Sequence, residues 1–79
     1  YNVLFTDKAK RDLKKLNPAL QDIEKLKEYS ENPYEYSRKL RDSSIGQYRF
    51  RIGDYRAAFD IDGENIVILR IRDRKEIYR

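Results

Sequence analysis

The chain has 79 residues, of which 41% are charged, 39% hydrophobic and 13% aromatic. This predicts one domain over residues 1–79, too polar for a membrane protein and too aromatic for a disordered tail. Without cysteine there are no disulfides or thiolates, and without histidine there are no imidazole metal sites or imidazole acid–base pairs. With no apolar run near the roughly 18–20 residues of a transmembrane helix, we expect a cytoplasmic protein with no membrane partner.

The excess of positive charge lies in one half of the chain. Residues 1–37 carry seven Lys or Arg and seven Asp or Glu, whereas residues 38–79 carry eleven against seven, so the whole net charge of +4 falls in the second half. Nine of those eleven basic residues are arginines. Arginine binds phosphate through paired hydrogen bonds and stacks on bases, so we expect the functional chemistry in the second half.

The first half predicts a short strand and two helices. Residues 1–5 contain β-forming side chains, and Thr6 is a suitable N-cap for a helix whose apolar residues recur at helical spacing. The break at Asn17 and Pro18 predicts a second helix, with Asn17 as its N-cap and Pro18 in its first turn, ending near residues 30–33. The two helices form an antiparallel hairpin that needs another layer to pack on.

The second half changes to the period of a β-sheet. Residues 32–46, rich in Asn, Pro, Ser and Gly, predict a loop, and the alternation that follows predicts strands at 48–52, 55–61 and 66–72. Short turns make consecutive strands antiparallel. The predicted fold class is therefore α+β with two layers, in which the N-terminal strand and the helical hairpin pack on a four-stranded, mostly antiparallel sheet.

Arginines alternate along all three of these strands. We expect the strand face away from the helices to carry Arg49, Arg51, Arg56, Arg70 and Arg72. On the last strand we expect Val67, Leu69 and Ile71 to face the helices instead. Like charges opposite one another destabilise a sheet, so this pattern indicates a polyanionic partner. The alternative is a solvated face with surface ion pairs, each worth about 0–1 kcal/mol.

Tyrosines and carboxylates give weaker signals. Strand period assigns Tyr48 and Tyr55 to the core, whereas spacing alone leaves Tyr78 open between packing and function. Asp60 and Asp62 share a strand face and could hold a cation, but we interpret them as the polar flank of a hairpin loop.

Several stretches together resemble a known family. The most specific are residues 46–56 (GQYRFRIGDYR) and 74–79 (RKEIYR), supported by Val3-Leu4-Phe5, Leu13-Lys14-Lys15-Leu16 and Lys39-Leu40-Arg41. Their order and spacing resemble the RelE/ParE superfamily of prokaryotic toxin–antitoxin toxins, closest to RelE-type mRNA interferases. The resemblance covers essentially the whole chain and implies the same α+β fold.

The resemblance also implies an activity and partners. RelE-type toxins are metal-independent, ribosome-dependent endoribonucleases, which cut mRNA in the A site through attack by the 2′-hydroxyl and so inhibit translation. The resemblance implies no cofactor. It implies that the ribosome and mRNA are partners, together with a RelB-like antitoxin that forms a hetero-oligomer with a toxin that is a monomer when free.

Six positions match functional positions of that family. The resemblance assigns catalysis to Arg56, Arg74 and Tyr78. It assigns substrate binding to Arg41, Arg49 and Arg51. Some members have lysines in place of Arg49 and Arg51, and because arginine stays charged, proton-transfer roles of those lysines do not carry over.

Two other functions remain open on the sequence. The first is a ParE-like toxin, which inhibits DNA gyrase by protein binding and generally lacks the late arginine and tyrosine. The second is a basic RNA-binding module without chemistry. The presence of Arg56, Arg74 and Tyr78 together favours the nuclease.

Overall fold

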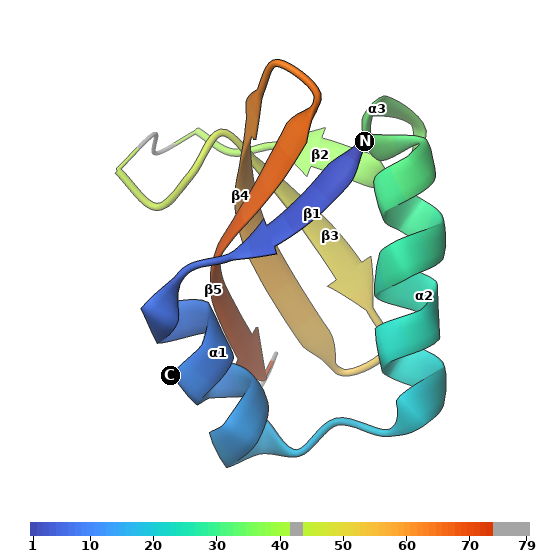
Figure 1. Ribbon diagram of the computed structural model, residues 1–79, viewed down its shortest axis with the longest axis vertical. Coiled ribbons are helices and arrows are strands. Elements are labelled where there is room, and N and C mark those ends of the chain that lie inside the picture. Colours follow the sequence, from blue (N-terminus) through green and yellow to red (C-terminus); the bar gives the residue numbers. More distant parts are fainter. Residues whose placement is uncertain (42–43, 74–79) are drawn as a thin grey trace.

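The structure, a computed structural model, describes residues 1–41 and 44–73 (Figure 1). The elements in chain order are β1 (Asn2–Phe5), α1 (Asp7–Leu16), α2 (Leu20–Glu31), α3 (Pro33–Tyr36), β2 (Ser37–Lys39), β3 (Tyr48–Ile52), β4 (Tyr55–Asp62) and β5 (Asn65–Asp73).

The fold is α+β with helices packed on a mostly antiparallel sheet, which confirms the predicted class. The strand order is β1-β5-β4-β3-β2, with β1 parallel to β5 and every other pair antiparallel. The sequence predicts four strands, whereas the sheet formed by the described residues has five. The additional strand, β2, lies in the predicted loop and pairs with the edge of β3. Its three residues are too few to show an alternating apolar pattern.

Both long helices pack on the sheet. α1 packs against β5 and β1, and α2 packs against β3 and β1 (Figure 1). Within the described ranges, none of the helices combines the length and the apolar composition needed to cross a membrane.

The boundary between the helices differs from the prediction. Thr6 caps α1 as expected, since its hydroxyl accepts a hydrogen bond from the amide of Ala9 at 3.1 Å. The prediction that Asn17 begins the second helix is wrong: it ends α1, with φ 47° and ψ 58°, and its amide donates to the carbonyl of Leu13. Asparagine tolerates this left-handed conformation, and proline often follows it because it cannot continue a helix.

The core lies between the helices and the sheet and is built around two phenylalanines. Phe50 and Phe59 are fully buried, and their rings stack with centroids 4.2 Å apart. Tyr48 stacks on Phe59 at 5.7 Å, and Tyr55 also packs against this cluster. The prediction that Tyr48 and Tyr55 are core residues is confirmed.

A β-bulge in β5 changes which of its side chains face the helices. Ala58 pairs with Arg70 whereas Phe59 pairs with Ile68, so Leu69 is an extra residue without a register partner. An extra residue shifts the side-chain alternation by one position. The residues buried toward the helices are therefore Ile66, Ile68 and Ile71. The expectation that Val67 and Leu69 face the helices is wrong, whereas that for Ile71 is confirmed.

Candidate functional site

Arginines form two rows across the sheet, on the face away from the helices. In the first row, Arg51 on β3, Arg56 on β4 and Arg72 on β5 are successive cross-strand partners. In the second row, the partners are Arg38 on β2, Arg49, Ala58 and Arg70. Direct partners in antiparallel strands project to the same side, so the predicted arginine face exists and gains Arg38 from the strand that the sequence did not reveal.

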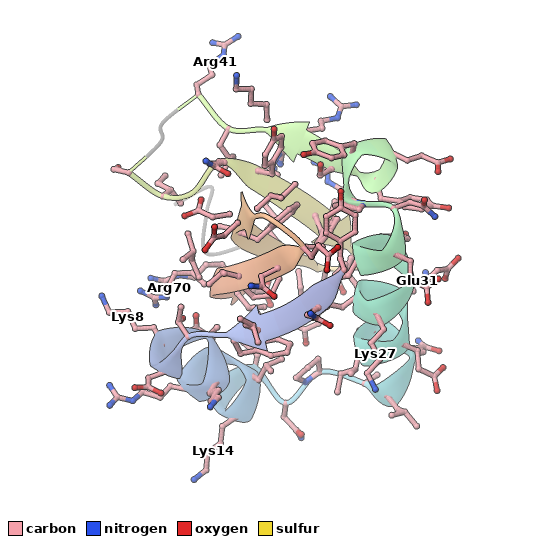
Figure 2. All side chains as sticks on the ribbon, turned by 45° about the horizontal axis from the view of Figure 1, so that its top comes forward. Lys8, Lys14, Lys27, Glu31, Arg41 and Arg70 are labelled. Carbon is pink, nitrogen blue, oxygen red and sulfur yellow. The ribbon has the colours of Figure 1, made fainter. Side chains whose placement is uncertain are left out.

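A pocket of about 650 Å³ opens among these arginines. Four arginines belong to its lining: Arg49, Arg56, Arg70 and Arg72. Its apolar lining residues are Leu40, Ile45, Ala58 and Leu69, and Thr6, Lys8 and Ser44 complete the lining. Lys8 at the start of α1 extends the positive charge beyond the sheet, on the same side of the molecule as Arg70 (Figure 2).

Two of the arginines are partly withdrawn from water. Arg49 and Arg56 are each half-buried, and the Nη1 atom of Arg49 and the Nε atom of Arg56 are buried. A charge in such a place interacts more strongly with an anion than an exposed charge does, because less water screens it. This arrangement can bind a phosphate group, and the apolar lining residues can receive an uncharged, planar group.

The predicted site residues are only partly brought together. Arg49 and Arg56 line the pocket, whereas Arg51 is exposed beside Arg56, outside the lining. Arg41 is exposed and projects from the segment that follows β2 (Figure 2). Two predicted catalytic residues, Arg74 and Tyr78, lie outside the described residues, so their roles stay predictions.

The loop segment formed by residues 44–47 lies beside the pocket and is held in place by Gln47. Its backbone amide donates to the Asp60 carboxylate at 2.8 Å, and its side-chain oxygen accepts from the backbone amide of Ile61 at 3.1 Å. Its carbonyl accepts from the amide of Leu40, a lining residue, at 2.9 Å. Asp60 therefore anchors this loop, and in the part of the chain that the structure describes no three Asp or Glu side chains form a metal-binding cluster.

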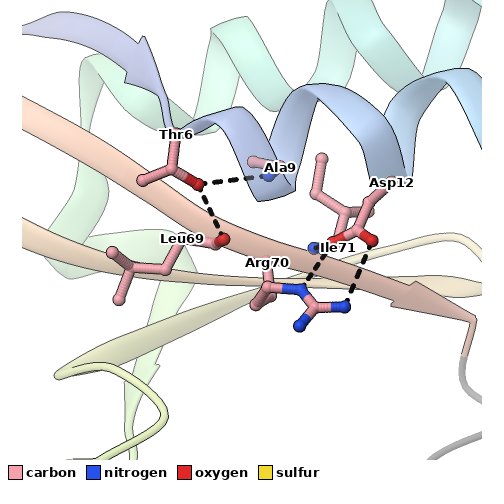
Figure 3. A network of polar contacts seen from close by, with 6 residues as sticks. All are labelled: Thr6, Ala9, Asp12, Leu69, Arg70 and Ile71. Atoms are coloured by element: carbon pink, nitrogen blue, oxygen red, sulfur yellow. Dashed lines mark hydrogen bonds and ion pairs between the residues drawn. The ribbon is translucent and has the colours of Figure 1, made fainter.

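Asp12 on α1, to which the sequence analysis assigns no role, contacts the pocket through Arg70. Its carboxylate accepts hydrogen bonds from Nε of Arg70 at 2.9 Å, from Nη2 at 3.3 Å and from the amide of Ile71 at 2.9 Å (Figure 3). Burial alone would raise the pKa of Asp12, but these hydrogen bonds and the charges of Arg70 and Arg72 outweigh it and hold the pKa below its ordinary value. Asp12 was detectable in the sequence only as an acid within a lysine-rich helix.

The comparison with known families agrees with this fold. A model of the family described as ParE toxin of type II toxin–antitoxin system, parDE, matches residues 3–78. The chain belongs to this family and is a type II toxin of the RelE/ParE superfamily.

Individual relatives support the same assignment. The chain is 37% identical over 86 residues to the toxin RelG of Mycobacterium tuberculosis, a match that covers 100% of this chain and 97% of that protein. It superposes on a chain of the toxin–antitoxin complex RelBE2 of M. tuberculosis with a TM-score of 0.72 and 33% identity, over 94% of this chain and 98% of that chain. The RelB–RelE complex of Methanococcus jannaschii has the same fold, with a TM-score of 0.69 at 24% identity over 95% and 94% of the two chains.

Proposed function

We propose that this toxin is a RelE-like, ribosome-dependent endoribonuclease that cleaves mRNA in the A site and so inhibits translation. The observation that carries the proposal is the pocket whose lining combines four arginines with apolar side chains. RNA presents that combination of groups, with phosphates for the guanidinium groups and bases for the apolar side chains.

The reaction needs a base for the 2′-hydroxyl, a cation for the charge on the phosphate and an acid for the leaving 5′-oxygen. The 2′-hydroxyl loses its proton and attacks the adjacent phosphorus, the bond to the 5′-oxygen breaks, and that oxygen takes up a proton, which leaves a 2′,3′-cyclic phosphate. Arg56 and Arg74 stabilise the charge that develops on the phosphate. Tyr78 serves as the general base or the general acid, because the arginines stay protonated.

The other basic residues bind the substrate. Arg49, Arg51 and Arg41 position the RNA backbone, with Arg49 inside the pocket and the other two on the exposed surface around it. Arg72 lines the pocket as the direct partner of Arg56 and contributes another phosphate contact. In this proposal the chemistry uses these side chains alone, with no metal or cofactor.

An antitoxin of the RelB type is the proposed protein partner. RelBE2, one chain of which is 33% identical to this one, is a toxin–antitoxin complex. An antitoxin segment rich in Asp and Glu would complement the arginine face and would neutralise the toxin by covering it. Adding such an antitoxin should abolish cleavage in proportion to its concentration, and its affinity should fall as salt is raised.

Cell-free translation with primer extension along a reporter mRNA tests the activity. The wild-type chain is compared with Arg56→Ala and with Lys25→Ala, which removes an exposed charge on α2, away from the pocket. New mRNA ends at translated codons, present with wild type and Lys25→Ala but lost with Arg56→Ala, would support the nuclease. Full-length mRNA and undiminished translation with the wild-type chain would reject it.

Inhibition of DNA gyrase through protein contacts is the second candidate. The observation that favours it is the match to a family model whose description names the ParE toxin. A supercoiling assay with the same preparations separates the two functions, since a gyrase inhibitor would block supercoiling and leave mRNA intact.

A further inference from the structure

The edge of β5 next to the bulge is covered by α1. β1 ends at Phe5, opposite Ile68, and among residues 1–41 and 44–73 no strand pairs with β5 beyond that point on that edge. The hydroxyl of Thr6 donates to the carbonyl of Leu69 at 2.9 Å, and the carboxylate of Asp12 accepts from the amide of Ile71 (Figure 3). Asp12 is therefore anchored to the sheet by a backbone contact that does not involve Arg70.

This anchored carboxylate holds Arg70 from one side. It engages the Nε and Nη2 atoms of Arg70, and Nη1 stays outside the pair (Figure 3). A guanidinium has five N–H donors, so a carboxylate bound along this side leaves other donors to bind a second anion. The side chain of Arg70 is 33% exposed and forms part of the pocket wall.

The surroundings of Arg70 keep it at the pocket. Its cross-strand partner is the small residue Ala58, and the bulge places Leu69 on the same wall, so the guanidinium borders the apolar part of the lining. The side chain of Asp12 is only 13% exposed, and its pKa lies below the ordinary value, so it is ionised at neutral pH and its hold on Arg70 persists.

We propose that Arg70 is a further phosphate-binding residue of this pocket and that Asp12 is the positioning residue that sets its orientation. The inference rests on RNA being the substrate, as proposed above. Asp12 compensates part of the charge of Arg70, so Arg70 contributes a directed contact at a set place more than it contributes long-range attraction.

Salt-dependent RNA binding tests the role of Arg70. The affinity of the chain for a short single-stranded RNA is measured from low to high salt for wild type, Arg70→Gln and Lys25→Gln, which removes the same charge from α2. One lost phosphate contact lowers the slope of log affinity against log salt by about 0.7. We expect that change for Arg70→Gln and a much smaller one for Lys25→Gln. Equal slopes for wild type and Arg70→Gln would overturn the proposal, as would a wild-type chain that does not bind RNA.

Kinetics on mRNA-programmed ribosomes test the role of Asp12. We expect Asp12→Asn to lower kcat about 10- to 100-fold, as misplaced binding groups do, with KM retained and the RNA salt slope not lowered, because Arg70 remains charged. Asp12→Glu should restore much of the rate. Asp62→Asn, which removes an exposed carboxylate at the end of β4, should leave it unchanged. Arg70→Lys should behave like Asp12→Asn, because lysine keeps the charge but lacks the planar fork.

The folded fraction of each variant, followed by circular dichroism at the assay temperature, separates positioning from stability. A loss of rate in Asp12→Asn that matches its loss of folded protein would reject the positioning role. If the wild-type chain cuts no mRNA, the proposed function fails, but the RNA-binding series still decides whether Arg70 contacts the backbone.

Discussion

Arg51 on β3 and Arg56 on β4 are direct cross-strand partners, on either side of the turn that joins their strands. Such pairs have Cα atoms about 4.5–5.5 Å apart, and two like charges in this relation destabilise a sheet. Arg72 on the other side of Arg56 repeats the relation. The sheet therefore concentrates positive charge where its own stability would favour less of it, as expected of a surface that binds a polyanion.

Replacing Arg51 should separate stability from function. Arg51→Thr removes the repulsion with Arg56 and introduces a good strand former, so the free energy of unfolding should rise by about 0.2–1 kcal/mol at low salt. RNA binding should weaken at the same time. Urea denaturation at low and high salt checks the first effect, and the gain should shrink as salt screens the charges. If Arg51→Thr were less stable than wild type at low salt, repulsion between Arg51 and Arg56 would not be lowering the stability of the sheet.

Ala57 and Ala58 are neighbours on β4 that face opposite sides of the sheet. Ala58 lines the pocket, whereas Ala57 is 1% exposed in the core. We expect Ala58→Val to fold with unfolding free energy within about 0.5 kcal/mol of wild type and to impair cleavage, because its methyl groups enter the pocket. Ala57→Val should cost about 1–3 kcal/mol through overpacking. Denaturation and cleavage assays on both variants check the contrast, which would vanish if the pocket took no part in the reaction.

The Asp12–Arg70 pair should make stability depend on pH. The folded-state pKa of Asp12 lies below the ordinary value of 3.8, so its contribution is fully present above that value and is lost as the pH falls through the folded-state pKa. At pH 7 we expect Asp12→Asn to lower the free energy of unfolding by about 1–3 kcal/mol. Urea denaturation of both chains should give a difference that is constant near neutral pH and shrinks below about pH 4. A difference independent of pH would mean that the charge of Asp12 does not stabilise the fold.

Much of this architecture follows from local patterns. The alternation along β3 and β4 indicates both the core aromatics and the arginine face, and the cap at Thr6 locates the start of α1. The same patterns predict the fold class, and resemblance to a family assigns functional roles to Arg49 and Arg56, which the structure places in one pocket.

The features that escaped prediction depend on pairing between distant segments. The bulge at Leu69 arises because Ile68 and Arg70 pair with adjacent residues of β4, and nothing local to β5 signals it. β2 exists because β3 offers an edge, and its own three residues carry no strand pattern. Asp12 is 58 positions from Arg70 in the chain, so only the packing of α1 on β5 brings them together.

Gly46 joins the loop beside the pocket to the sheet. Its φ is +146°, a conformation that other residues rarely adopt, and an added Cβ would lie 3.2 Å from a methyl carbon of Leu69 in the pocket wall. Gly63, in the turn between β4 and β5, also has a positive φ (+59°), but an added Cβ there would meet no atom within 4 Å. The two glycines thus share backbone strain on substitution and differ in the contact with the pocket.

Alanine at each glycine should reveal that difference. Gly63→Ala should cost about 1–2 kcal/mol of unfolding free energy from backbone strain alone and leave cleavage unchanged. Gly46→Ala should cost more, and it should also lower the cleavage rate of the folded protein because Leu69 must move. Denaturation gives the first comparison, and cleavage rates corrected for folded fraction give the second. Equal corrected rates for the two variants would show that the position of Leu69 does not matter to the site.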